Sequence, residues 1–218
     1  LGTPTDDGFV YRVDLRLRPF GDSGPVAVSF DAMEEYLQQH GRDWERYAYV
    51  KARPVYGAES GFKDLYRDAL RPFVYRRYLD FGVFESLRAM KELIAREVER
   101  RELQQNVKLG PGGILEIEFI VQAFQLLRGG STQRLQPRSL LEALPQLAGQ
   151  KLLPADTVTE LLAAYRFLRR VENRLQEWND EQTHELPVEP VARARLALAM
   201  GMADWPALQR ELQAHRDR

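Results

Sequence analysis

The sequence predicts a mainly α (α+β) protein, in which a small β segment at the N-terminus precedes a helical bundle. Apolar and charged residues alternate from Phe9 to Arg18, which is the period of a half-buried strand. Farther along the chain, apolar residues recur every three or four positions, most clearly over 84–102 and 156–178. Because the two patterns occupy separate parts of the chain, we expect strands and helices to be segregated.

The N-terminal pattern predicts one strand with an apolar face and a charged face. The glycine- and proline-rich residues 21–25 end this strand, and Val26 to Phe30 is a candidate partner strand. We therefore predict a hairpin.

The rest of the chain predicts helices separated by turns. Asp31 and Glu34 form a capping pair for the first helix, which Gly41 closes, and Pro72 is expected to kink or interrupt the segment 61–78. Ser139 with Glu142, and later Asp204, also carry capping patterns. The other predicted helices cover 44–54, 84–102, 114–127 and 156–178, followed by two shorter helices.

Composition excludes several classes of protein. The 218 residues are 44% hydrophobic, and 31 basic and 32 acidic side chains leave a net charge of -1. We therefore expect no binding of nucleic acid by bulk charge. There is no cysteine, which excludes disulfides and thiolate metal sites, and no apolar run long enough to span a bilayer. We expect no membrane association and a cytoplasmic location.

The first candidate site is the charged face of the N-terminal strand. Side chains two apart on a strand point the same way, so Asp14 lies between Arg12, Arg16 and Arg18. Guanidinium groups match phosphate oxygens, and a carboxylate among them can bind Mg²⁺ or Mn²⁺. The alternative is a solvated strand face whose acid pairs with its neighbours. A single carboxylate also does not make a metal site.

The second candidate site is a glycine-rich segment before a predicted helix. Gly112 and Gly113 let backbone N–H groups approach an anion at the positive end of the helix, and Lys108 adds a charge. Glu116 and Glu118 are possible acids or bases, but two residues apart on a helix they diverge. A tight turn between helices explains the glycines equally well.

Two further groups carry no functional assignment. Trp44 and Tyr47 are expected to pack in the core while the charges of their helix face outward. His40, His184 and His215 are far apart in sequence and lack metal-ligand spacing.

The order of motifs resembles one family. The motifs are VDLRLRPFGDSGP, GRDWERYAYVKARPV, RPFVYRRYLDF, KLGPGGILEIEFIVQAFQLLRGG and FLRRVENRLQEWNDEQTHELP. Together they resemble the bifunctional glutamine synthetase adenylyltransferase/adenylyl-removing enzyme over nearly the whole chain. RPFGDSGP, GRDWERYA and RPFVYRRYLDF resemble its N-terminal, adenylyl-removing half.

The resemblance implies a fold and an activity. Residues 1–60 would be the C-terminal part of a nucleotidyltransferase-like catalytic domain, and 61–218 a helical bundle whose segment 106–119 faces the active site. The family's N-terminal half removes AMP from an adenylylated tyrosine of glutamine synthetase by phosphorolysis, giving ADP. Its other half attaches AMP from ATP, and PII signal proteins and glutamine set the balance of this nitrogen-regulating enzyme.

The resemblance also implies site residues. Asp14 would be the third carboxylate of a site for Mg²⁺ or Mn²⁺. Arg16, Arg18 and Lys108 would contact AMP or phosphate, with Gly112 and Gly113 shaping the approach and Glu116 and Glu118 as weaker candidates.

The resemblance leaves open which half of the enzyme the chain represents, and it places part of the metal site outside the sequence. The family's first two metal carboxylates belong to an Asp-x-Asp pair that would precede Leu1, so we expect an excised, inactive piece of the enzyme. The chain could instead be the adenylylating half, or a helical module that docks glutamine synthetase or a PII protein.

Overall fold

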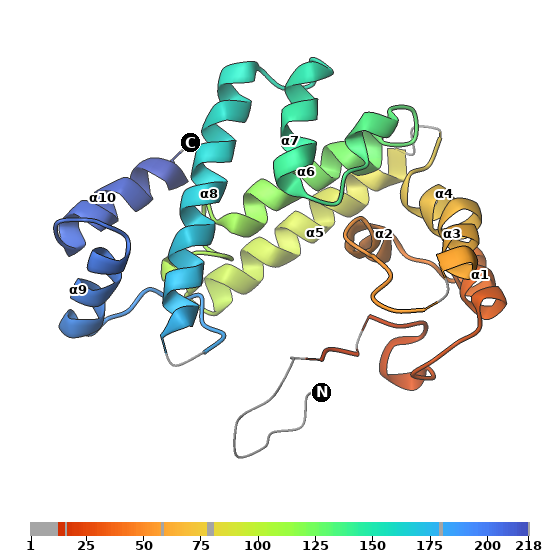
Figure 1. Cartoon of the computed structure of the whole chain (residues 1–218), viewed down its shortest axis with the longest axis horizontal. Coiled ribbons are helices and arrows are strands. Elements are labelled where there is room, and N and C mark those ends of the chain that lie inside the picture. The colour runs from red at the N-terminus through yellow and green to blue at the C-terminus, as the bar shows by residue number, and fades with distance from the viewer. Residues whose placement is uncertain (1–12, 16, 58, 78–80, 179–180, 218) are drawn as a thin grey trace. The chain divides into compact units, whose positions relative to one another are not determined.

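The structure is a computed structural model, and it describes residues 13–15, 17–57, 59–77, 81–178 and 181–217. The chain divides into two compact units, Leu1–Val74 and Tyr75–Arg218. As predicted, the described residues are mainly helical (Figure 1).

The predicted N-terminal hairpin is not present in the described residues. The described positions from Val13 to Leu17 are not in a strand, and Val26 to Ser29 are irregular, while Phe9–Arg12 and Arg16 lie outside the described residues. A strand needs a hydrogen-bonded partner, and the described chain offers none beyond one isolated bridge, between Asn106 and Glu185.

A turn organised by Arg18 takes the place of the hairpin. Its guanidinium group donates hydrogen bonds to the carbonyl oxygens of Leu15, Asp22 and Gly24, at 2.7, 3.3 and 3.2 Å. The turn contains the short 3₁₀ helix η1, Gly21–Ser23. These bonds satisfy three backbone carbonyl groups of the segment.

The first unit is built from four short helices and a π-helical turn. They are α1 (Phe30–Gln39), α2 (Asp43–Tyr49), α3 (Glu59–Leu65), the π turn η2 (Tyr66–Leu70) and α4 (Arg71–Val74). The hydroxyl of Ser29, one residue before α1, accepts a hydrogen bond from the Ala32 N–H, so Ser29 rather than Asp31 caps this helix. The π turn ends at Leu70, and helical structure continues through Pro72 to Val74, so this proline does not interrupt the predicted segment.

The most deeply buried residues of α2 are two charged ones rather than the predicted Trp44 and Tyr47, although Tyr47 is half-buried. Glu45 and Arg46 are 3% and 1% exposed, whereas Trp44 is 45% exposed. Both charges are satisfied inside the unit. Glu45 accepts hydrogen bonds from the Tyr36 hydroxyl (2.7 Å) and the Arg42 N–H (2.8 Å). Arg46 donates from Nε and Nη2 to the carbonyl oxygen of Val74, and its Nη1 lies 3.2 Å from Asp43 Oδ1.

The second unit is a bundle of longer helices. Its elements are α5 (Phe81–Arg100), η3 (Leu103–Gln105), α6 (Ile114–Arg128), η4 (Gln133–Leu135), α7 (Leu140–Gly149), α8 (Ala155–Glu177), α9 (Pro190–Ala199) and α10 (Trp205–Arg216). The predicted helices over 84–102, 114–127 and 156–178 are confirmed within a few residues. The predicted cap of α10 is also confirmed, because Asp204 Oδ1 accepts from the Ala207 N–H at 2.8 Å.

Helix α8 is the centre of this unit. It packs against α6, α7, α9 and α10 (Figure 1). Its buried stripe includes Leu161, Leu168 and Val171, as the periodicity predicts. Trp178, placed on the same stripe from the sequence, is instead 52% exposed, because it follows the last helical residue and stacks with Arg195. No helix among the described segments is both long and apolar enough to cross a membrane.

Candidate functional site

The glycine-rich segment 106–113 is held in place by residues far away in the sequence. The Val107 N–H donates to the His184 carbonyl oxygen (2.8 Å), and the Asn106 amide donates to Glu185 Oε1 (2.7 Å). From the end of α10, Arg216 donates to the carbonyl oxygens of Gln104 (3.1 Å) and Asn106 (2.8 Å). These hydrogen bonds therefore hold the segment in place directly before the first residue of α6, Ile114.

The two predicted site glycines allow close backbone approach within this segment. Gly112 has φ +62°, and a Cβ atom there would lie 2.2 Å from the carbonyl oxygen of Arg216. Gly113 precedes α6, and a Cβ atom would lie 2.7 Å from the carbonyl oxygen of Gly110. Both geometries require glycine. Packing of the turn against α10 therefore explains Gly112 without a ligand.

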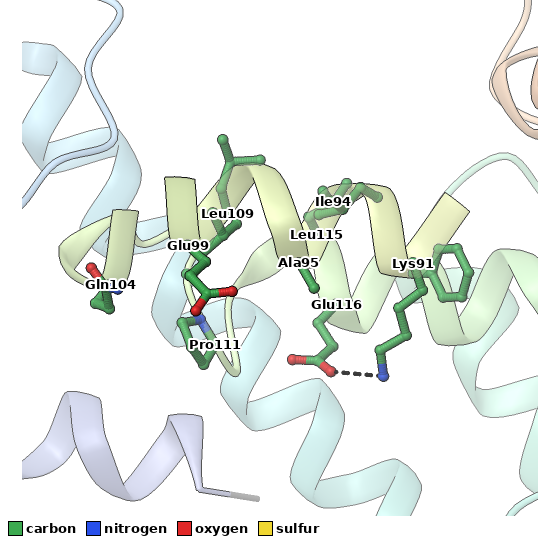
Figure 2. A pocket seen from close by; sticks show the side chains of 12 residues that line it. Lys91, Ile94, Ala95, Glu99, Gln104, Leu109, Pro111, Leu115 and Glu116 are labelled. Carbon is green, nitrogen blue, oxygen red and sulfur yellow. Dashed lines mark ion pairs between the residues drawn. The ribbon is translucent and has the colours of Figure 1, made fainter. Parts of the chain in front are cut away.

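The two predicted glutamates of α6 point to different places, as their spacing predicted. Glu116 accepts a hydrogen bond from the Gly112 N–H (3.0 Å) and pairs with Lys91 of α5 (3.1 Å), as Figure 2 shows. Glu118 accepts from the hydroxyl of Tyr165 on α8 (3.2 Å). The two carboxylates therefore cannot both contact the same ligand atom.

Lys108 and Glu118 lie at a polar cluster on α8 that the sequence analysis missed. At its centre Glu172 is 2% exposed, and its Oε1 lies 3.0 Å from His184 Nδ1. Its Oε2 lies 2.6 Å from Arg169 Nη1. We call Lys108, Glu118, Tyr165, Arg169, Glu172 and His184 the α8 cluster.

Electrostatics inside the α8 cluster shift two pKa values. Burial, assisted by the charge of Glu118, raises the pKa of Tyr165 to about 12. Burial, assisted by the charge of Lys108, lowers the pKa of His184, although Glu172 opposes this shift. His184 is therefore neutral at pH 7, and a neutral imidazole can still donate a hydrogen bond to Glu172.

The lowered pKa of His184 predicts a pH-dependent stability. Because the folded pKa lies below the unfolded value of about 6.5, the unfolded chain binds more protons between the two values. Stability is fully present above about pH 6.5 and falls as the pH falls toward the folded pKa, with a slope of at most about 1.4 kcal/mol per pH unit. Urea unfolding of the wild type and His184→Gln between pH 5 and 7.5 measures this dependence. Equal pH dependence in the two proteins would contradict it.

One signal in the sequence could have revealed the α8 cluster. Glu172 lies four residues after Leu168 and directly after Val171, on the stripe that the apolar period marks as buried. A buried carboxylate needs a hydrogen-bonding or charged partner, so this position predicts a basic residue beside it. His184 itself lies outside the helix, where periodicity carries no information.

Of the three site residues predicted on the N-terminal segment, the structure describes Asp14 and Arg18. Asp14 is exposed, and Arg16 lies outside the described residues. Arg18 is directed at the carbonyl groups of its own turn, and its side chain is 17% exposed. In the structure Arg18 therefore shapes the segment that follows Asp14.

Two family models match the chain. Residues 88–218 match the model described as GlnD PII-uridylyltransferase, and residues 1–65 match the model described as glutamate-ammonia ligase adenylyltransferase. The first match alone covers more than half of the chain. The chain therefore belongs to the family that this model describes, GlnD PII-uridylyltransferase, whereas the adenylyltransferase model matches less than a third of the chain. The longer match begins within α5 and includes the whole α8 cluster.

The resemblance to the adenylyltransferase implies a divalent metal, but the residues that the structure describes do not by themselves fit one. Within those residues, no three histidine, cysteine or acidic side chains are grouped as metal ligands. Mg²⁺ bound through protein side chains needs carboxylates that converge, and Asp14 supplies one. No chemical step below is therefore routed through a metal ion.

Proposed function

We propose that the chain is part of the enzyme that removes the adenylyl group from glutamine synthetase, which is glutamate-ammonia ligase. The observation that carries this proposal is the adenylyltransferase match over residues 1–65, which contain RPFGDSGP and GRDWERYA. These two motifs resemble the adenylyl-removing half. In the structure the first motif contains the Arg18 turn, and the second contains the buried side chains of Glu45 and Arg46.

The proposed reaction is phosphorolysis. An oxygen of inorganic phosphate attacks the phosphorus of the adenylyl-tyrosine, and the bond from phosphorus to the tyrosine oxygen breaks. The products are ADP and the free tyrosine, whose oxygen takes up the proton that the phosphate carried. We propose that Arg16 binds phosphate oxygens and that Arg18 acts by holding the turn beside Asp14.

The proposal also names partners and a location. Glutamine synthetase is the protein substrate, AMP, ADP and phosphate are the small ligands, and a PII signal protein is the regulator. We propose a cytoplasmic enzyme that uses Mg²⁺ or Mn²⁺, with Asp14 as one ligand and upstream residues as the others.

The test is the identity of the nucleotide product. The chain is joined to the upstream Asp-x-Asp segment that the resemblance implies, and is incubated with adenylylated glutamine synthetase, Mg²⁺ and phosphate. We expect ADP, formed only when phosphate is present. Consumption of ATP with release of pyrophosphate would instead identify the adenylylating half and overturn the proposal.

A further inference from the structure

A groove between α5 and α6 is not used by the residues proposed for phosphate binding. It has a volume of about 340 Å³, within the range of small-molecule sites. One wall comes from α5, the other from the first turns of α6, and the glycine-rich segment closes one side (Figure 2). The groove lies within the second unit and is defined by described residues alone.

The walls of the groove are apolar. Six side chains from three elements provide them: Ile94, Val98, Leu109, Pro111, Leu115 and Phe119. All except Pro111 are half-buried, so they form a surface that is only partly covered. Two facing apolar walls suit a flat ring, whose two faces both lose contact with water on binding.

Two hydrogen-bonding side chains lie toward one end of the groove. Figure 2 shows Gln104 and Glu99 at the end where Pro111 lies. Among the described residues, neither the Glu99 carboxylate nor the Gln104 carboxamide has a side-chain partner. The backbone of Gln104 is fixed by Arg216, which donates to its carbonyl oxygen. This end therefore offers a carboxylate acceptor beside an amide that both donates and accepts.

The charges of the groove restrict its ligand. Lys91 is paired with Glu116 at the other end, which leaves the carboxylate of Glu99 as the unbalanced charge. A phosphate group inside the groove would be repelled. The ligand that fits is a neutral flat ring with an amino donor next to a ring-nitrogen acceptor.

We propose that this groove binds the adenine ring of an adenosine-containing ligand. The exocyclic amine of adenine can donate to Glu99, and its amine and N7 match the carboxamide of Gln104, a pairing that Asn and Gln make with adenine. This inference rests on the proposed function in one respect: the adenylyl group that the enzyme would remove contains adenine. The phosphate of such a ligand lies outside the groove.

The test compares nucleosides that differ at the exocyclic group. Adenosine, inosine and AMP are titrated into the full chain by calorimetry. We expect adenosine to bind with a dissociation constant on the order of 0.1 mM, and inosine about tenfold or more weakly, because its carbonyl oxygen faces the Glu99 carboxylate. AMP should bind no more tightly than adenosine.

Three variants locate the binding. Ala95→Trp fills the groove and should abolish adenosine binding, whereas Leu93→Trp, at a 64% exposed position of α5 outside the groove, should leave it unchanged. Glu99→Gln, at an exposed position, should bring adenosine and inosine within about threefold of each other. Thermal unfolding of each variant shows that it is folded.

Several outcomes overturn the inference. These are equal affinity for adenosine and inosine, no adenosine binding up to about 10 mM, or equal loss in the two tryptophan variants. Equal binding of both nucleosides would mark an unselective apolar surface that a partner helix covers. ADP formation is assayed separately. If ADP forms but adenosine does not bind in the groove, the groove assignment is wrong and the proposed function stands. If adenosine binds in the groove but no ADP forms, the proposed function is wrong.

Discussion

Replacing Arg46 by methionine is expected to destabilise the first unit by about 3 kcal/mol. The side chain is 1% exposed, and its guanidinium group satisfies the Val74 carbonyl oxygen and pairs with Asp43. Methionine is of similar length but leaves that buried carbonyl oxygen without the guanidinium donors. The cost of a buried acceptor that has lost its donors exceeds the gain from added apolar surface.

The measurement is hydrogen exchange in the wild type and the variant, read on peptides of α2 and α4. Arg53→Met is the matched control, because Arg53 is exposed and its replacement should change stability by no more than about 0.5 kcal/mol. Protection in α8, in the second unit, serves as an internal reference. If Arg46→Met and Arg53→Met changed the protection of α2 equally, the buried network would not stabilise this unit.

Replacing Asp14 by asparagine is expected to lower the rate of phosphorolysis by at least about a hundredfold, or ~2.7 kcal/mol of transition-state stabilisation. Asparagine keeps the size of the side chain and removes its charge, so the fold of the exposed segment should persist. The resemblance assigns this carboxylate to the metal set. Steady-state rates of ADP release measure the effect, and Mn²⁺ binding should weaken in parallel.

Asp22→Asn is the control for this change. Asp22 is an acid eight residues away, its side chain is 85% exposed, and its ion pair with Arg18 is long at 3.9 Å. An exposed pair of this kind contributes little. We expect wild-type activity. Full activity in Asp14→Asn would show that the N-terminal segment does not carry the chemistry.

Helices that bury one stripe of apolar residues could be predicted from the sequence. In α8, Leu161, Leu168 and Val171 recur at the helical period, and they are buried as expected. In α2 the same reasoning failed. Its seven residues give too few repeats to fix a face, and the favourable partners of Glu45 and Arg46 come from Tyr36 and Val74, which lie on other elements.

Sites made by distant residues could be predicted only in part. The glycine-rich segment before α6 was found, because Gly112 and Gly113 stand directly before an apolar run. Its anchors, Arg216 and His184, come from positions about 110 and 80 residues away in the sequence, and no local pattern links them. The roles proposed for Lys108, Glu116 and Glu118 stay predictions.

The fate of labelled phosphate tests most directly the proposal that this chain is part of an enzyme that acts by phosphorolysis. Isotopically labelled inorganic phosphate is supplied with adenylylated glutamine synthetase and the chain joined to the upstream acidic segment. Attack by phosphate on the adenylyl phosphorus predicts that all of the label in the nucleotide product lies in the β-phosphate of ADP. Release of unlabelled AMP, or label incorporation that does not depend on Asp14, would contradict the account.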